Sequence, residues 1–184
     1  SESAFGNKWI APTSPLTAFR GYEINSSANA TPTNVYDFVG KLNVGNKAVA
    51  ISKSTGVNYS GRNLIGNSYT AAIPIVGGFS FNGTWDNNVY LFNTGSRNEW
   101  RKLSGATVYG VEGGRYLSVP TNTAGQANLP DRIPSMHAFM IDATTAGTLS
   151  IDYSKLTNNT LVNGVAWRSS NNKPVEMPYI VMEV

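Results

Sequence analysis

The chain is a succession of short apolar or alternating runs that are interrupted by Gly, Pro and Asn. No stretch of about 10–12 residues shows the 3.6-residue periodicity and the capping residues of an amphipathic helix. Alternation with a period of two, bounded by turn residues, is typical of β-strands. The sequence therefore predicts an all-β protein with strands at 16–24, 35–42, 47–53, 63–66, 89–93, 106–111, 114–119, 136–143, 148–153 and 178–184.

Two of these strands carry a more specific pattern. Leu149, Ile151 and Tyr153 alternate with polar residues, which predicts a strand with one buried and one solvent-exposed face. Residues 138–141 are apolar on both sides and predict a central strand that is covered on both faces.

The connections between the strands are rich in turn residues. Asn82-Gly83, between two aromatic residues, is a strong signal for a β-hairpin. Residues 121–130 and 157–163 are predicted to be long loops. Many short strands with such connections are typical of a β-sandwich or a barrel.

Two parts of the chain repeat one pattern. Residues 16–24 and 133–141 share the order aliphatic, two residues, large apolar, one residue, small, aromatic, one residue, aliphatic. Residues 40–44 and 147–151 share a second, shorter pattern. Either the chain contains two related halves, or its strands resemble one another by chance. We favour an antiparallel β-sandwich of the jelly-roll type that forms a single domain over 1–184. Its two halves are predicted at about 1–60 and 61–155, and a final strand is predicted at 175–184. We expect the chain to be a fragment of a longer protein.

Composition excludes several classes of protein. Charged residues make up 14% of the chain, the formal net charge is +3, and the basic residues are scattered, so no phosphate-binding face and no nucleic-acid partner are expected. The chain has no cysteine, which excludes disulfides and thiolate chemistry. No apolar run reaches the roughly 18 residues of a membrane span. The polar surface is therefore supplied mainly by Asn, Ser and Thr. We expect the fold to be stabilised by packing, without disulfides.

Three short motifs of the chain fit a pattern that recurs in one known family. Residues 63–69 are Asn-Leu-Ile-Gly-Asn-Ser-Tyr, with Ser68 where Pro is usual in that pattern. Residues 133–139 are Ile-Pro-Ser-Met-His-Ala-Phe, with His137 where Gln is common, and Gly-Thr-Leu follows at 147–149. Over about residues 8–155, the chain resembles a β-sandwich module repeated in large secreted and surface proteins of Bacteroidetes. This resemblance implies a β-sandwich fold and a secreted or cell-surface location, and it implies no active site.

Groups suited to catalysis are sparse. His137 is the single histidine, and its place on a predicted central strand favours a structural, hydrogen-bonding role. Asp86, Glu99 and Glu112 are the best candidates for a glycosidase-type pair of carboxylates, but nothing in their spacing marks them as one. We therefore predict no catalytic residue, no metal ligand and no cofactor, and we predict that the chain is not an enzyme.

Aromatic residues make up 11% of the chain and suggest one kind of binding site. Sugar rings pack their C–H faces on flat aromatic side chains, while amide, carboxylate and guanidinium groups bind the hydroxyls. The opposite interpretation is that these aromatics fill the core, because they are good strand formers. The candidate ligand-binding residues are Trp85, Asp86, Tyr90, Arg97, Trp100 and Tyr109.

Three functions fit these observations. The one we favour is a non-catalytic extracellular module that acts as a scaffold or adhesion element, with glycans or other surface proteins as partners. The alternative is a carbohydrate-binding module, which exposed aromatic residues beside Asn and Arg would support. A small glycoside hydrolase or lyase is the third, and it would require two close carboxylates in a groove.

Overall fold

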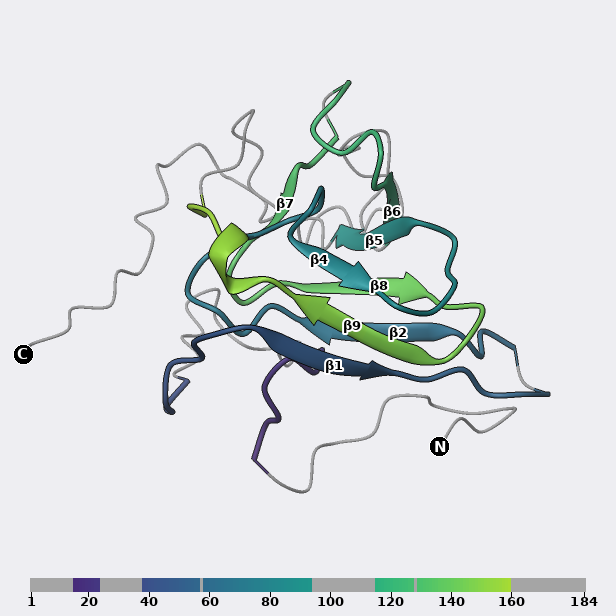
Figure 1. Ribbon diagram of the computed structural model, residues 1–184, viewed down its shortest axis with the longest axis horizontal. Helices are drawn as coiled ribbons and strands as arrows, with labels where there is room; N and C mark the ends of the chain where they lie inside the picture. The colour runs from purple at the N-terminus through teal and green to yellow at the C-terminus, as the bar shows by residue number, and fades with distance from the viewer. Residues whose placement is uncertain (1–14, 24–37, 57, 94–114, 128, 160–184) are drawn as a thin grey trace, which may run out of the picture.

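The computed structural model describes residues 15–23, 38–56, 58–93, 115–127 and 129–159 (Figure 1). These residues form β-strands and one turn of 3-10 helix, η1 (Tyr153–Lys155), and contain no α-helix. The all-β prediction is therefore confirmed for this part of the chain. The strands are β1 (Lys47–Ile51), β2 (Arg62–Gly66), β3 (Ile73–Pro74), β4 (Phe79–Phe81), β5 (Asn88–Asn93), β6 (Arg115–Pro120), β7 (Arg132–Ile133), β8 (Ala138–Asp142) and β9 (Gly147–Ile151).

The described strands form three sheets, and all of their pairings are antiparallel. A three-stranded sheet has the order β1-β9-β4, a four-stranded sheet has the order β2-β8-β5-β6, and β3 pairs with β7. In Figure 1 the three-stranded sheet lies in front of β2 and β8. Along the sequence, the chain passes from the three-stranded to the four-stranded sheet after β1 and again after β4, and it returns to the three-stranded sheet at β4 and at β9.

The three-stranded and the four-stranded sheet share one hydrophobic core. Leu149 and Ile151 enter it from β9, and Phe139 and Ile141 enter it from β8. The ring of Phe79 in β4 lies 5.8 Å from that of Phe139, which joins the two sheets directly. Leu149 and Ile151 are two positions apart in β9, and so are Phe139 and Ile141 in β8. Since side chains two positions apart share one face of a strand, all four lie on the facing sides of the two sheets. Thus the pattern predicted for 148–153 is confirmed at Leu149 and Ile151, while Tyr153 is exposed in η1.

Strand β8 is covered on both faces, as predicted. It lies between β2 and β5, and Phe139, Met140 and Ile141 are all buried. Phe139 and Ile141 belong to the shared core, whereas Met140 points to the other face of the sheet, where its cross-strand neighbours are Leu64 and Tyr90. A central strand that is apolar on both sides suits this double burial.

Six predicted strands are confirmed, with small differences at their ends: 47–53, 63–66, 89–93, 114–119, 136–143 and 148–153. The predicted strands at 106–111 and 178–184 lie outside the described residues. Strands β3, β4 and β7 were not predicted. They have only two or three residues each, which is too short for an alternating pattern to appear in the sequence.

The strand predicted at 16–24 is wrong over its described part. Residues 17–20 form a turn in which Arg20 N donates to Thr17 O at 3.3 Å, and Phe19 has a φ of 63°. Only an isolated bridge follows, between Arg20 and Ile65. The left-handed backbone at Phe19 turns its side chain into the core and breaks the alternation that a strand would need.

The prediction of a strand at 35–42 is also wrong at 38–42, and residues 35–37 lie outside the described part. Residues 38–42 are irregular and exposed, and Val39 is fully exposed. Among the described residues no strand pairs with 38–42, so its apolar residues have no partner strand to hydrogen-bond with. Of the shorter pair of matching segments, 147–151 is strand β9, whereas 40–44 has no regular structure.

The bend at Asn82-Gly83 does not close a hairpin. Asn82 extends the pairing of β4 with β9, because its N donates to Thr148 O at 3.2 Å. Trp85, two residues after the bend, pairs with Ala143 at the end of β8. The bend therefore carries the chain from the three-stranded to the four-stranded sheet, a choice that depends on distant strands rather than on the turn residues.

Candidate functional site

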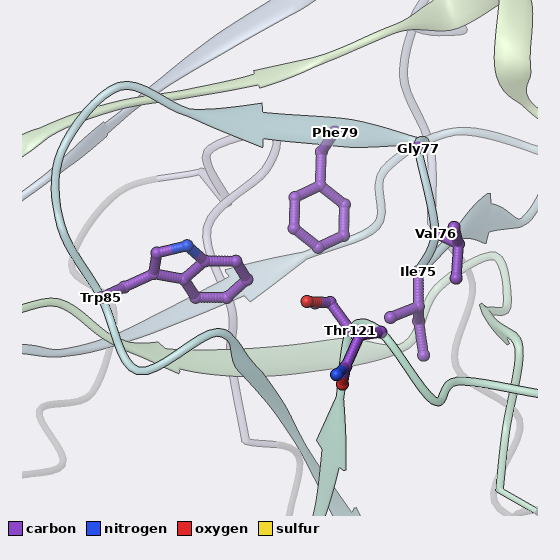
Figure 2. A pocket seen from close by; sticks show the side chains of 7 residues that line it. Ile75, Val76, Gly77, Phe79, Trp85 and Thr121 are labelled. Carbon is purple, nitrogen blue, oxygen red and sulfur yellow. The ribbon is translucent and has the colours of Figure 1, made fainter.

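A hollow of about 240 Å³ lies beside the start of β4 and contains Trp85, one of the candidate ligand-binding residues. Its walls come from the turn between β3 and β4, from β4 itself, from the bend before β5 and from the loop after β6. Figure 2 shows the rings of Trp85 and Phe79 directed toward Ile75 and Thr121. The lining residues are Ile75, Val76, Gly77, Phe79, Trp85, Thr121 and Asn122.

Trp85 is half-buried and held from two sides. Its backbone forms a bridge with Ala143, which fixes the start of the side chain. Its indole lies 6.1 Å from the ring of Phe79 and 6.4 Å from that of Phe81, both in edge-to-face geometry. Such packing is favourable for aromatic pairs and leaves few rotamers open. The indole therefore forms a rigid wall of the hollow.

The polar groups of the hollow are uncharged. Thr121 is positioned by a hydrogen bond from its N to Asn87 O at 2.9 Å. Within the described residues, the Thr121 hydroxyl, the Asn122 amide and the Trp85 indole N–H have no hydrogen-bond partner in the protein, and none of them is sealed from solvent. No Asp, Glu, Lys or Arg lines the hollow. The site can thus bind a neutral ligand that offers both apolar surface and hydroxyl groups.

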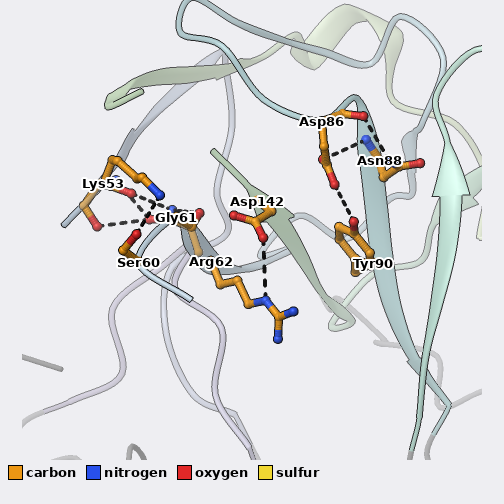
Figure 3. Close-up of polar contacts among 10 residues, drawn as sticks. Lys53, Ser60, Gly61, Arg62, Asp86, Asn88, Tyr90 and Asp142 are labelled. Atoms are coloured by element: carbon orange, nitrogen blue, oxygen red, sulfur yellow. Dashed lines mark hydrogen bonds and ion pairs between the residues drawn. The ribbon is translucent and has the colours of Figure 1, made fainter. Parts of the chain in front are cut away.

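Asp86 and Tyr90 form a separate polar cluster on the outer face of the four-stranded sheet (Figure 3). The Tyr90 hydroxyl donates to Asp86 Oδ2, and Asn88 N donates to Asp86 Oδ1 at 3.1 Å. The hydrogen bond to Asp86, followed by burial, raises the pKa of Tyr90 to about 12. Tyr90 therefore stays protonated at neutral pH. The cluster fixes the turn that begins β5.

The structure places only three of the six candidate ligand-binding residues. Asp86 and Tyr90 are in contact, but Trp85 lies apart from them on the core side of the sheet. Tyr90 is on the opposite side, because its neighbours Val89 and Leu91 are in the core. The others, Arg97, Trp100 and Tyr109, lie outside the described residues, as do Glu99 and Glu112.

Sequence reasoning missed every lining residue of the hollow except Trp85. The six missed residues are Ile75, Val76, Gly77, Phe79, Thr121 and Asn122. The last two follow β6 and begin a loop that was predicted correctly, at 121–130. No local pattern marks them as partners of Trp85. They are brought to it by the pairing of β5 with β6, in which Asn88 lies opposite Pro120.

His137 agrees with the structural role expected for it. Its ring Nδ1 lies 3.1 Å from Ser135 O, and its backbone carbonyl accepts a hydrogen bond from Asn67 N at 2.8 Å. No group of three or more His, Cys, Asp and Glu side chains suited to a metal ion occurs among the described residues. The same residues include no helix with the length and apolar character required to cross a bilayer.

Comparison with known proteins gives one informative similarity. No family model and no solved structure matches the chain. The chain is similar to the minor fimbrium subunit Mfa5 of Porphyromonas gingivalis, with 50% identity over 190 residues that cover 97% of this chain and 16% of the relative. It thus spans about a sixth of the length of that relative. Because a fimbrium is a structure of the bacterial cell surface, this similarity confirms the predicted surface location.

Proposed function

We propose that the chain is a non-catalytic module of a fimbrial protein at the bacterial surface, where it acts as a scaffold or adhesion element. The observation that carries this proposal is the 50% identity to a minor fimbrium subunit along 97% of the chain. Its partners are then other fimbrial proteins. The low content of charged residues and the continuous core of the two sheets suit a structural unit in a larger assembly.

The fold that we infer for this module is a single β-sandwich built from two related halves. The shared core of the two larger sheets supports the sandwich. Phe19 and Met136, which occupy the same place in the matching segments 16–24 and 133–141, have φ values of 63° and 62°. Both segments then approach the same strand from opposite sides: Gly66 N donates to Phe19 O, and Met136 N donates to Asn67 O.

The parallel between these segments supports duplication because residues other than glycine rarely have a positive φ. Here two such residues occupy matching positions, and each precedes a segment that pairs with β2. A chance resemblance between strands would not produce this agreement in backbone conformation. The alternative function, a carbohydrate-binding module, has one feature of the described residues in its favour, the hollow beside Trp85.

The test of the fimbrial proposal uses intact cells of the bacterium that makes the protein. An antibody raised against this chain should label the cell surface in electron microscopy and should detect the parent protein in sheared, purified fimbriae. Deletion of the module from the parent protein should lower its amount in that fraction, whereas Trp85→Phe should not. Parent protein found only inside the cells, or at the surface but absent from purified fimbriae, would contradict the proposal.

A further inference from the structure

We propose that the hollow beside Trp85 binds one hexopyranose ring of a neutral glycan. In this arrangement an apolar C–H face of the sugar packs on the indole, and Thr121 and Asn122 bind its hydroxyl groups. The proposal goes beyond the scaffold role and does not depend on it. It concerns a site built from three separate segments of the chain, 75–79, Trp85 and 121–122, most of which no sequence motif marks.

The size of the hollow suits a single ring. Its volume of about 240 Å³ lies just below the roughly 300–1,000 Å³ of sites that enclose drug-sized molecules. A longer oligosaccharide therefore places one ring in the hollow and extends into solvent. Val76, which is 60% exposed, lies at the rim and is available for contact with a neighbouring ring.

The chemistry of the walls is that of a sugar site. Ile75, Phe79 and Trp85 provide an apolar surface, and aromatic faces are the usual partners of the C–H faces of sugars. Since no charged residue lines the hollow, nothing in it would compensate the desolvation of a carboxylate or phosphate. A neutral ring is therefore favoured over an anionic sugar or a nucleotide.

The free polar groups favour a sugar over an apolar side chain of another protein. The indole N–H, the Thr121 hydroxyl and the Asn122 amide supply three donor groups and two acceptor groups around the apolar floor. A purely apolar occupant would take these groups out of water and leave them unpaired, which costs free energy. Sugar hydroxyls replace the lost water at the same positions.

The backbone of β4 adds a further partner. Asp152 N donates to Gly78 O, and Asn82 N donates to Thr148 O, so Gly78 and Asn82 direct their backbone groups toward β9. By the alternation of an antiparallel ladder, the N–H and C=O of Phe79 point to the opposite edge of β4, where the described residues provide no strand. Phe79 itself is one of the residues that line the hollow. Its walls are fixed in advance by the contacts of Trp85 and Thr121, which lowers the entropy lost on binding.

The proposal is tested by NMR titration of the chain with methyl α- and β-glycosides of glucose, galactose and mannose, with methyl glucuronide as the anionic comparison. The indole N–H signal of Trp85 should shift with at least one neutral glycoside, with a Kd of about 1–10 mM, as expected for a single ring. The glucuronide should bind about 10-fold more weakly or not at all.

Two variants and one control locate the site. Asn122→Ala removes an exposed amide without disturbing the core and should weaken binding about 5-fold or more. Trp85→Phe keeps an aromatic ring against Phe79 and should weaken binding about 10-fold. Because Trp85→Phe has no indole signal, binding to both variants is followed at the backbone amide of Thr121, which lines the same hollow. Tyr90→Phe, on the other face of the sheet, should leave the affinity unchanged. Thermal unfolding confirms that each variant is folded.

The proposal is overturned if no neutral glycoside shifts the Trp85 signal at concentrations up to about 100 mM, or if Asn122→Ala and Trp85→Phe bind as tightly as the parent chain. Neither result would affect the labelling of cells and fimbriae described above, so failure of the sugar site and failure of the fimbrial role are separate outcomes.

Discussion

At the scale of single residues, the fold depends on a buried amide. Asn67 is 1% exposed and is the one buried polar residue in the described part of the chain. Its side-chain nitrogen lies 2.9 Å from the carbonyl oxygens of Ala71 and Ile133 and 3.0 Å from that of Pro134. Its Oδ1 accepts a hydrogen bond from Tyr69 N at 3.1 Å. One side chain thereby joins two segments that are far apart in the sequence.

The substitution Asn67→Asp should lower the free energy of unfolding by about 3 kcal/mol at pH 7. The carboxylate oxygen that replaces the side-chain nitrogen would face the three carbonyl oxygens and could not donate to them. Asn46→Asp is the matched control. Asn46 Oδ1 only accepts, from Tyr153 N at 2.9 Å, so this variant should change stability by no more than about 0.5 kcal/mol. Urea denaturation measures both, and equal losses would show that the amide hydrogens of Asn67 are unimportant.

The hydrogen bond between Tyr90 and Asp86 should make the stability of the fold depend on pH in the alkaline range. The hydrogen bond to Asp86 raises the pKa of Tyr90 to about 12, from 10.0 in an unfolded chain. A pKa raised by folding means that the stabilisation is fully present below pH 10 and is lost as the pH rises through about 12. Tyr90→Phe should therefore be less stable than the parent chain at pH 8, and the difference should shrink above pH 10 in denaturant titrations. A constant difference from pH 8 to 12 would contradict the assignment.

At the scale of elements, a close approach of backbone segments fixes where β2 and β8 meet. Ala143 N donates to Gly61 O at 2.8 Å, and a Cβ built on Gly61 would lie 1.9 Å from Ala143 O. Glycine is needed at position 61 because any side chain would collide with the backbone of Ala143, and not because the backbone there has a positive φ. Because the contact joins the start of β2 to the end of β8, it sets the register of the central strand pair, Arg62 with Asp142.

The substitution Gly61→Ala should lower the free energy of unfolding by about 2 kcal/mol, since backbone atoms must move to admit the methyl group. At Gly40 an added Cβ meets nothing within 4 Å, so Gly40→Ala should be neutral or should stabilise the chain by about 0.5 kcal/mol. Denaturant midpoints compare the two variants. A loss at Gly40 as large as that at Gly61 would contradict the steric explanation.

The elements also show how far the sequence alone was informative. Six strands of the described part were predicted because their apolar or alternating runs continue over at least four residues. The strand expected at 16–24 failed because a positive φ at Phe19 is not encoded by residue type. The hairpin expected at Asn82-Gly83 failed because the next residues pair with β8 rather than with β4. Local sequence specifies a bend but does not specify which strand follows it into which sheet.

At the scale of the whole molecule, stability is a property of both larger sheets together. Phe139 lies in the four-stranded sheet, and its ring contacts that of Phe79 in the three-stranded sheet. Neither sheet can bury its apolar face alone, because the core residues of each face those of the other. We therefore expect the two sheets to unfold as one cooperative unit.

Phe139→Ala should lower the free energy of unfolding by about 3–5 kcal/mol, because it leaves a cavity between the sheets. Amide hydrogen exchange should accelerate in β9 as well as in β8, although the substitution lies in β8 alone. Val39→Ala, at a fully exposed position, is the control and should change neither measurement. Faster exchange confined to β8 and its neighbours β2 and β5 would show that the sheets unfold separately.

The sequence by itself determined the all-β class, the longest strands, the double burial of β8 and, through resemblance, the surface location. The class, the strands and the burial of β8 follow from side-chain periodicity and composition, which are local or averaged properties, whereas the location is what the resemblance implies. Only the tertiary structure decided the partner of each strand, the crossing at Asn82-Gly83 and the joining of Trp85 with Thr121 and Asn122. These depend on pairing between residues far apart in the chain, where hydrogen bonding and the burial of a shared core select one arrangement among many that the local pattern allows.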